Sequence, residues 1–250
     1  MSDQAIQLMH GDCLALMPLI PAGSVDMILT DLPYGTTACK WDVVIPFAPL
    51  WEAYRRVIKL NGAIVLFGSQ PFTSALVISN AKMFRYELIW HKSRATGFLN
   101  APKVPLKKHE NIAVFCAGAP TYNPQMRAGL KHGRMSGYHK GNKAQVYNFT
   151  ERGHPSVAED FYPDTVNYFK CEAHPLHPTQ KPVLLLEYLT RTYTNEGETV
   201  LDSCMGSGST GAACINTGRK FIGIEKDETY FRVCQERVRD EQRQGRLFTV

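Results

Sequence analysis

Short apolar runs alternate with stretches of helical spacing over the first half of this chain, and this alternation limits the fold more than any other feature. Two stretches, Pro49–Lys59 and Phe72–Ala81, have helical spacing, and Asn61-Gly62 is expected to end the first helix. Strands that alternate with helices form mostly parallel sheets with right-handed crossovers. We therefore expect a doubly wound α/β fold. The expected buried strands are Val25–Thr30, Ala63–Gly68, Tyr86–Trp90 and Ile112–Cys116.

The alternation stops in the middle of the chain and returns near the C-terminus. Residues 118–172 are rich in glycine, proline, asparagine, histidine and tyrosine and have no sustained period, which is typical of a loop-rich insertion. Pro182 suits the first residue of a helix. We expect residues 1–117 and 173–250 to form the two halves of one domain around an inserted lobe, 118–172. The later elements are expected at Thr199–Asp202, Thr210–Thr217, Lys220–Glu225 and Glu228–Arg243.

A glycine-rich segment follows one of the C-terminal strands. Gly206-x-Gly208-x-x-Gly211 lies between an expected strand and an expected helix, where glycines allow a tight turn and the helix N-terminus offers free amide donors. Glu225 ends the next strand, where a carboxylate can accept hydrogen bonds from ribose hydroxyls. NAD would fit this half equally well. Asp202 argues against NAD, because an acidic group there repels a pyrophosphate but can hold the ammonium end of S-adenosylmethionine.

A second loop follows the expected strand Val25–Thr30. It reads Asp31-Leu32-Pro33-Tyr34 and places a carboxylate, a fixed backbone and an aromatic ring at the carboxyl end of a buried strand. Open α/β sheets bind their ligands at that edge. The same residue types also suit an ordinary turn, so the loop alone leaves both interpretations open.

With these loops the chain resembles the DNA amino-methyltransferases that carry an Asp-Pro-Pro-Tyr signature. It is most similar to their β group, in which the target motif precedes the cofactor motif. His177-Pro178-Thr179-Gln180-Lys181-Pro182 resembles the family segment before the first cofactor strand. Ile6–Cys13 resembles the strand whose terminal aspartate, here Asp12, reads the cofactor's adenine. The resemblance implies a circularly permuted, Rossmann-like methyltransferase fold that uses S-adenosyl-L-methionine.

The resemblance also implies roles for individual residues. Asp31, Leu32, Pro33 and Tyr34 would be catalytic, with Tyr34 stacking on a flipped-out base. Two residues depart from the family pattern: Leu32 replaces a proline, and Cys204 replaces an aromatic residue beside the cofactor. The implied cofactor-binding residues are Asp12, Asp31, Thr179, Lys181, Asp202, Cys204, Gly206, Ser207, Gly208, Ser209, Thr210, Glu225 and Lys226.

The implied reaction is methylation of the exocyclic N6 of adenine in duplex DNA by direct transfer. Asp31, where some relatives have serine, favours adenine N6 over cytosine N4 without deciding it. Methylation of adenine in RNA is a second alternative. A third is a catalytically silent DNA-binding module derived from such an enzyme.

Basic residues are concentrated in one quarter of the chain. Residues 92–152 contain eleven lysines and arginines but only two acidic residues, as expected of a surface that binds a polyanion such as double-stranded DNA. A solvated basic surface is the alternative. The expected phosphate contacts are Lys107, Lys108, Arg127, Lys131, Arg134, Lys140 and Lys143.

The rest of the composition bears on compartment and partners. The first residues lack a signal peptide, no apolar stretch is long enough for a membrane span, and the seven cysteines are scattered. We therefore expect a cytoplasmic protein without a metal site. A homodimer and a cognate restriction nuclease stay open as partners.

Overall fold

A computed structural model describes residues 6–36, 42–128, 160–173, 175–177 and 179–247. The chain divides into two compact units: Met1–Asn123 with Asp164–Val250, and the smaller Pro124–Pro163. The predicted lobe, 118–172, has wider bounds than this smaller unit. Within the part of the chain that the structure describes, no helix is long and apolar enough to cross a membrane.

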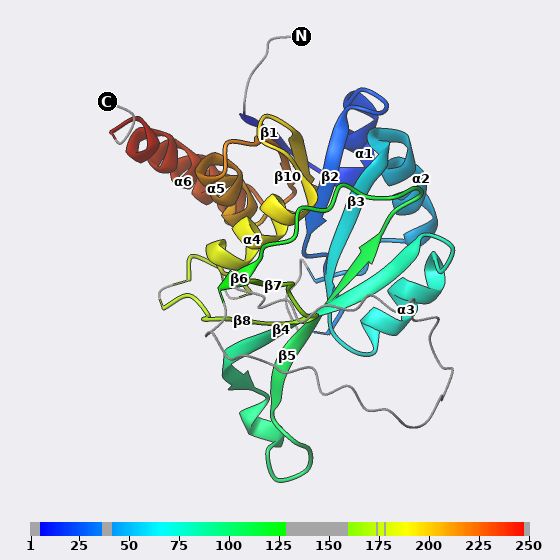
Figure 1. Ribbon diagram of the computed structural model, residues 1–250, viewed down its shortest axis with the longest axis vertical. Helices are drawn as coiled ribbons and strands as arrows, with labels where there is room; N and C mark the ends of the chain where they lie inside the picture. The colour runs from blue at the N-terminus through cyan, green and yellow to red at the C-terminus, as the bar shows by residue number, and fades with distance from the viewer. Residues whose placement is uncertain (1–5, 37–41, 129–159, 174, 178, 248–250) are drawn as a thin grey trace, which may run out of the picture. The chain divides into compact units, whose positions relative to one another are not determined.

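The larger unit is built on one eight-stranded sheet with the order β1-β10-β9-β2-β3-β5-β4-β8 (Figure 1). Strand β5 is antiparallel to both of its neighbours, and every other pairing in this sheet is parallel. The expected doubly wound, mostly parallel α/β fold is therefore confirmed. The strands are β1 (Ile6–His10), β2 (Val25–Thr30), β3 (Ile58–Gly68), β4 (Phe84–Thr96), β5 (Lys107–Phe115), β8 (Val166–Phe169), β9 (Thr199–Asp202) and β10 (Lys220–Glu225).

The two ends of the chain meet inside this sheet. Strand β1 pairs with β10 in parallel, from Ile6 opposite Phe221 to His10 opposite Glu225. The first strand of the sequence thus extends the sheet beyond the last one. This is the arrangement that the permuted motif order predicts.

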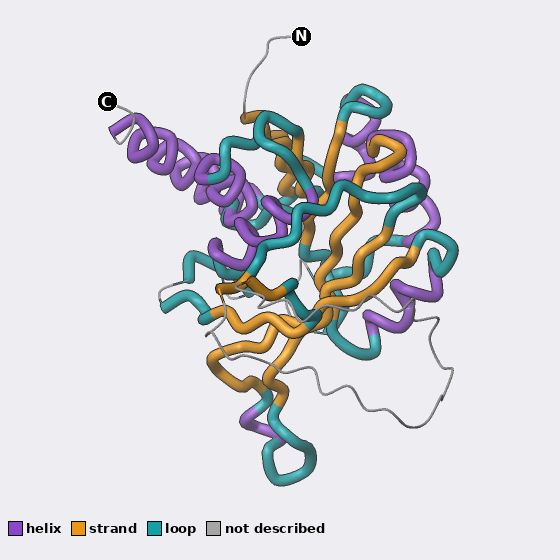
Figure 2. The backbone as a smooth tube through the Cα atoms, viewed as in Figure 1, coloured by secondary structure: helices purple, strands orange, loops and turns teal. Residues whose placement is uncertain are grey.

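Helices cover both faces of the sheet (Figures 1 and 2). Because side chains alternate along a strand, Ile28 joins a core with α1, α2 and α3, whereas Met27 and Leu29 join a second core with α4, α5 and α6. Strands buried on both faces explain the continuous apolar runs of the sequence. The helices are α1 (Cys13–Leu16), α2 (Phe47–Val57), α3 (Phe72–Ser79), α4 (Val183–Tyr193), α5 (Ser209–Asn216) and α6 (Glu228–Leu247).

Several predicted boundaries differ from those of the structure. Helix α2 ends before Ile58, and the expected stop Asn61-Gly62 lies inside β3, where the pairing with β2 shifts its register. An added Cβ on Gly62 would lie 2.8 Å from the Asp26 carbonyl oxygen, so glycine permits this close approach of two strands. The segment 164–172, expected in the lobe, supplies β8, which pairs with β4.

The smaller unit contains one antiparallel pair, β6 (Arg127–Ala128) with β7 (Asp160–Phe161). The segment between these strands, 129–159, lies outside the described residues.

Candidate functional site

The carboxyl ends of four adjacent parallel strands bring the two predicted loops together. Asp31 follows β2, Asp202 ends β9, Glu225 ends β10, and Asp12 follows β1. Together they border one cavity of about 820 Å³. Most of the predicted site residues line it: Asp12, Asp31, Leu32, Pro33, Tyr34, Thr179, Lys181, Asp202, Cys204, Gly206, Ser207, Ser209, Thr210, Glu225 and Lys226.

The glycine loop turns from β9 into α5 through two left-handed residues. Gly206 has φ +51° and Gly208 has φ +78°, backbone conformations that residues with a side chain rarely adopt. The amide of Gly206 donates to Glu225 Oε2 over 2.9 Å, which joins the loop to the end of β10. Gly208 packs against α6, because an added Cβ would lie 2.5 Å from Cys234 Sγ. Gly208 therefore shapes the loop from outside the cavity lining.

Asp202 is a buried anchor of this loop, with 4% of its surface exposed. Its Oδ2 accepts a hydrogen bond of 2.6 Å from the Thr210 hydroxyl, and its Oδ1 accepts from the Thr30 hydroxyl and, over 3.1 Å, from the Cys204 amide. Burial raises the pKa of Asp202 to about 6, although these hydrogen bonds oppose the shift. The carboxylate ties together the ends of β2 and β9 and the start of α5.

The second loop presents a carboxylate and an aromatic ring to the same cavity. The Tyr34 hydroxyl donates to Asp31 Oδ1 over 2.5 Å, and the Tyr34 ring lies 4.9 Å from that of Phe72. The Leu32 side chain is buried in the core beside α1 and α2, which anchors the loop. The loop is thus fixed at two residues that follow Asp31.

Asp31 belongs to a row of four alternating charges. Lys181 Nζ donates to Asp31 Oδ2 and lies 3.3 Å from Glu110 Oε2, and Lys92 pairs with the other oxygen of Glu110. Only 8% of the Lys181 side chain is exposed. Two negative and two positive groups balance here, so each buried charge has an opposite neighbour.

The pKa values in this row depend on burial and on neighbouring charge. Burial raises the pKa of Asp31; Lys181 opposes the shift and the Glu110 charge adds to it. The Lys181 pKa is raised by the two carboxylates, against the effect of burial. Glu110 and Lys92 were not predicted as site residues from the sequence, where they enter only the count of charges in residues 92–152. Lys92 lies near the end of β4 and Glu110 lies in its partner β5, and neither position has a local sequence signal.

The remaining predicted cofactor residues surround the glycine loop. Asp12 caps α1 by accepting from the Leu14 amide, and its other oxygen lies 3.3 Å from Lys226 Nζ. The Ser209 hydroxyl accepts from Arg237 over 3.0 Å. The interaction with the Cys204 thiol lowers the pKa of Cys13.

The predicted phosphate contacts separate into three groups. Lys107, in β5, donates to the hydroxyl of Ser69, and Lys108 beside it is exposed. Arg127 lies in the smaller unit. Lys131, Arg134, Lys140 and Lys143 lie outside the described residues.

The chain is similar in sequence to known DNA methyltransferases. Residues 25–236 match the sequence profile of a family described as DNA methylase. The chain is 32% identical over 256 residues to the DNA adenine methyltransferase YhdJ of Escherichia coli strain K12, an alignment that covers 94% of this chain and 83% of the relative.

Two solved structures share the fold. The cytosine-N4-specific PvuII DNA methyltransferase has a TM-score of 0.67 at 15% identity, covering 96% of this chain and 94% of the other. The complex titled M1.HpyAVI-SAM has a TM-score of 0.62 at 24% identity, covering 93% and 99%.

Proposed function

The chain belongs to the family of DNA amino-methyltransferases, and we propose that it transfers the methyl group of S-adenosylmethionine to the N6 amino group of an adenine in duplex DNA. One observation carries the proposal: the Asp31 carboxylate and the glycine loop at Gly206 border the same cavity. A base amino group and a methyl donor bound there would be neighbours. Holding two reactants together removes much of the entropic barrier of their reaction.

The polar groups around the glycine loop fit the cofactor. Each oxygen of Glu225 already accepts one backbone N–H, from Gly206 and Asp227, and each keeps a free lone pair for a ribose hydroxyl. Asp12 lies beside this position at the end of β1. The acidic lining suits the positive sulfonium and ammonium groups. When bound, the cofactor supplies an electrophilic methyl group.

The protein's part in the reaction rests on Asp31. The lone pair of an adenine amino group is delocalised into the ring, which makes the nitrogen a poor nucleophile. Asp31 accepts a hydrogen bond from one N–H, and the Leu32 carbonyl accepts the other. These bonds draw the nitrogen toward tetrahedral geometry and stabilise the positive charge that develops on it. The methylated nitrogen then releases a proton, which Asp31 is placed to accept.

Lys181 has a positioning role in this proposal. The sequence resemblance implied that Lys181 binds the cofactor, and in the structure its amine is bonded to Asp31 and Glu110. Lys181 keeps the buried Asp31 ionised and aims its carboxylate. Glu110 in turn limits how much Lys181 weakens Asp31 as an acceptor, because it shares the positive charge.

Adenine is favoured over cytosine by Asp31 and by the adenine relative from Escherichia coli. Cytosine N4 is the alternative, since the fold is shared with a cytosine-N4 enzyme and the same chemistry serves both amino groups. Tyr34, beside Asp31, is the ring on which the flipped base would stack, at about 1–3 kcal/mol for such a contact.

Product analysis tests this function. The purified protein is incubated with methyl-labelled S-adenosylmethionine and unmethylated genomic DNA, which is then digested to nucleosides and examined by mass spectrometry. We expect labelled N6-methyladenine. Labelled N4-methylcytosine would replace the base assignment and keep the mechanism. Transfer to RNA alone, or no transfer with intact DNA binding, would refute the proposal.

A further inference from the structure

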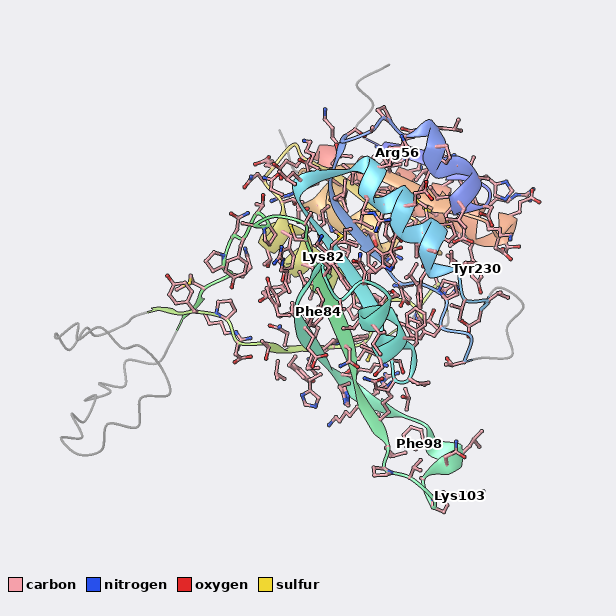
Figure 3. All side chains as sticks on the ribbon, turned by 90° about the vertical axis from the view of Figure 1, so that its right-hand side faces the viewer. Arg56, Lys82, Phe84, Phe98, Lys103 and Tyr230 are labelled. Carbon is pink, nitrogen blue, oxygen red and sulfur yellow. The ribbon has the colours of Figure 1, made fainter. Side chains whose placement is uncertain are left out.

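The hairpin of β4 and β5 has an exposed apolar tip on a basic outer part, and its two acidic residues, Glu87 and Glu110, lie nearer the base. From His91 to His109, which lie opposite each other in the two strands, the sequence contains five lysines and arginines and no acidic residue. At the tip, the short 3₁₀ helix Phe98–Asn100 leaves Phe98 68% exposed and Leu99 99% exposed. Figure 3 shows the tip, marked by Phe98 and Lys103, projecting away from the helices of the larger unit. Large apolar groups exposed in this way mark binding surfaces.

The same hairpin forms part of the wall of the reaction cavity. Lys92, Arg94 and Thr96, at the end of β4, line the cavity together with Asp31. Phe98 follows Arg94 by four residues, so the tip lies within about 14 Å of the cavity wall along the chain. This reach corresponds to about four base-pair steps of a duplex. The tip is therefore close enough to contact DNA whose target base occupies the cavity.

We propose that this hairpin is a DNA-binding element whose tip, Phe98 and Leu99, inserts as a wedge into the duplex beside the target base. Arg94, Lys103 and Lys108 contact the phosphates on either side. Apolar wedges of this kind unstack and kink a duplex, which eases extrusion of a neighbouring base. The inference rests on the proposed function for its choice of nucleic acid.

Charge and area favour duplex DNA over other occupants. A second copy of the chain would need an interface of about 1,200 Å² or more, and two side chains at a hairpin tip supply a small part of it. The basic outer part of the hairpin would also repel the same part of another copy. A polyanion that carries stacked, partly apolar bases complements both the charge and the apolar tip.

The test compares matched pairs of variants in the full chain. Phe98→Ser/Leu99→Ser removes the wedge, and Leu60→Ser/Ile78→Ser is its control. Leu60 and Ile78 are 77% and 78% exposed and lie outside the hairpin, near the start of β3 and near the end of α3. Lys103→Ala has its control in Lys82→Ala, also exposed and in the turn after α3. The probes are a 30-base-pair duplex and its single strand, each measured for affinity, salt dependence and methyl transfer.

We expect the wedge variant to lose about five-fold or more in duplex affinity while its control keeps it, because an aromatic–base contact supplies that much binding. Its methyl transfer to duplex should fall further than its transfer to single strand, where no base must be extruded. Lys103→Ala should reduce the salt slope of duplex binding by about 0.9, the contribution of one phosphate contact.

Two results would overturn the inference. One is duplex affinity and transfer equal to those of the wild type. The other is a wild-type dimer that becomes a monomer in the wedge variant without a change in DNA affinity. A wild-type protein that transfers no methyl group, but whose duplex affinity depends on the tip, would refute the proposed function and keep the hairpin. Methyl transfer that is unchanged in the wedge variant would refute the hairpin inference and keep the proposed function.

Discussion

Lys181 Nζ lies 3.3 Å from Glu110 Oε2 while it donates to Asp31, so one buried amine joins two carboxylates from distant parts of the sequence. Glu110 comes from β5, and Asp31 follows β2. The electrostatics of Asp31 therefore depend on a residue that has no place in the predicted motifs.

Replacing Glu110 tests this coupling. Because the Glu110 charge raises the pKa of Asp31, Glu110→Gln should lower that pKa. A weaker base is a poorer acceptor, so we expect kcat to fall by about ten-fold. The acid limb of the pH–kcat profile, where Asp31 becomes protonated, should move to lower pH. The control is Glu87→Gln, which replaces an exposed carboxylate of β4 that accepts a hydrogen bond from Asn111 and lies outside the cavity lining. An unmoved acid limb in Glu110→Gln would show that Asp31 and Glu110 are not coupled.

Asp202 predicts a pH dependence of stability. Burial raises its pKa from 3.8 to about 6, so the native state binds this proton more tightly than the unfolded state. The stability from this carboxyl is present below pH 4 and is lost as the pH rises through 6. Relative to Asp202→Asn, the wild-type free energy of unfolding should fall by up to about 3 kcal/mol between pH 4 and pH 7.

Urea unfolding of the two proteins across this pH range measures the difference. Asp240→Asn, an exposed carboxylate on α6, is the control, and its difference from the wild type should stay flat between the same pH values. A constant difference for Asp202→Asn as well would mean that the buried carboxyl keeps an ordinary pKa.

Gly208 predicts a loss of stability on substitution by alanine. Its left-handed backbone costs alanine about 1–2 kcal/mol, and the added Cβ would also lie 2.5 Å from Cys234 Sγ. Gly23 has a similar φ of +61° with nothing within 4 Å of an added Cβ. We expect Gly208→Ala to lose more free energy of unfolding than Gly23→Ala by about 1 kcal/mol or more. Equal losses would show that the contact with α6 relaxes freely.

Much of the fold was predictable because its strands are buried on both faces. Val25–Thr30 and Lys220–Glu225 coincide with β2 and β10, and the pairing of β1 with β10 follows from the motif order. The predicted boundaries were wrong where a residue that resembles a local signal serves a contact between distant parts of the chain. Asn61-Gly62 resembles a helix stop, but Gly62 serves a close approach between β3 and β2.

The site was predictable where its residues follow strands, and less so where they meet across the sheet. Asp31 and Gly206 stand in recognisable loops. Glu110 pairs with both Lys92 and Lys181, and it meets Lys92 through the pairing of β4 with β5, where Trp90 lies opposite Glu110. The exposed tip was not predicted either, because two adjacent apolar residues, Phe98 and Leu99, between two expected strands carry no periodic signal.

The most direct test of the mechanism is single-turnover methyl transfer by Asp31→Asn, with cofactor and duplex affinities measured on the same protein. The amide keeps the size of the side chain and removes the charge that stabilises the developing cation. We predict that transfer falls by about 100- to 1,000-fold while both affinities stay within a few-fold of the wild type. Transfer within ten-fold of the wild-type rate would contradict the role assigned to Asp31.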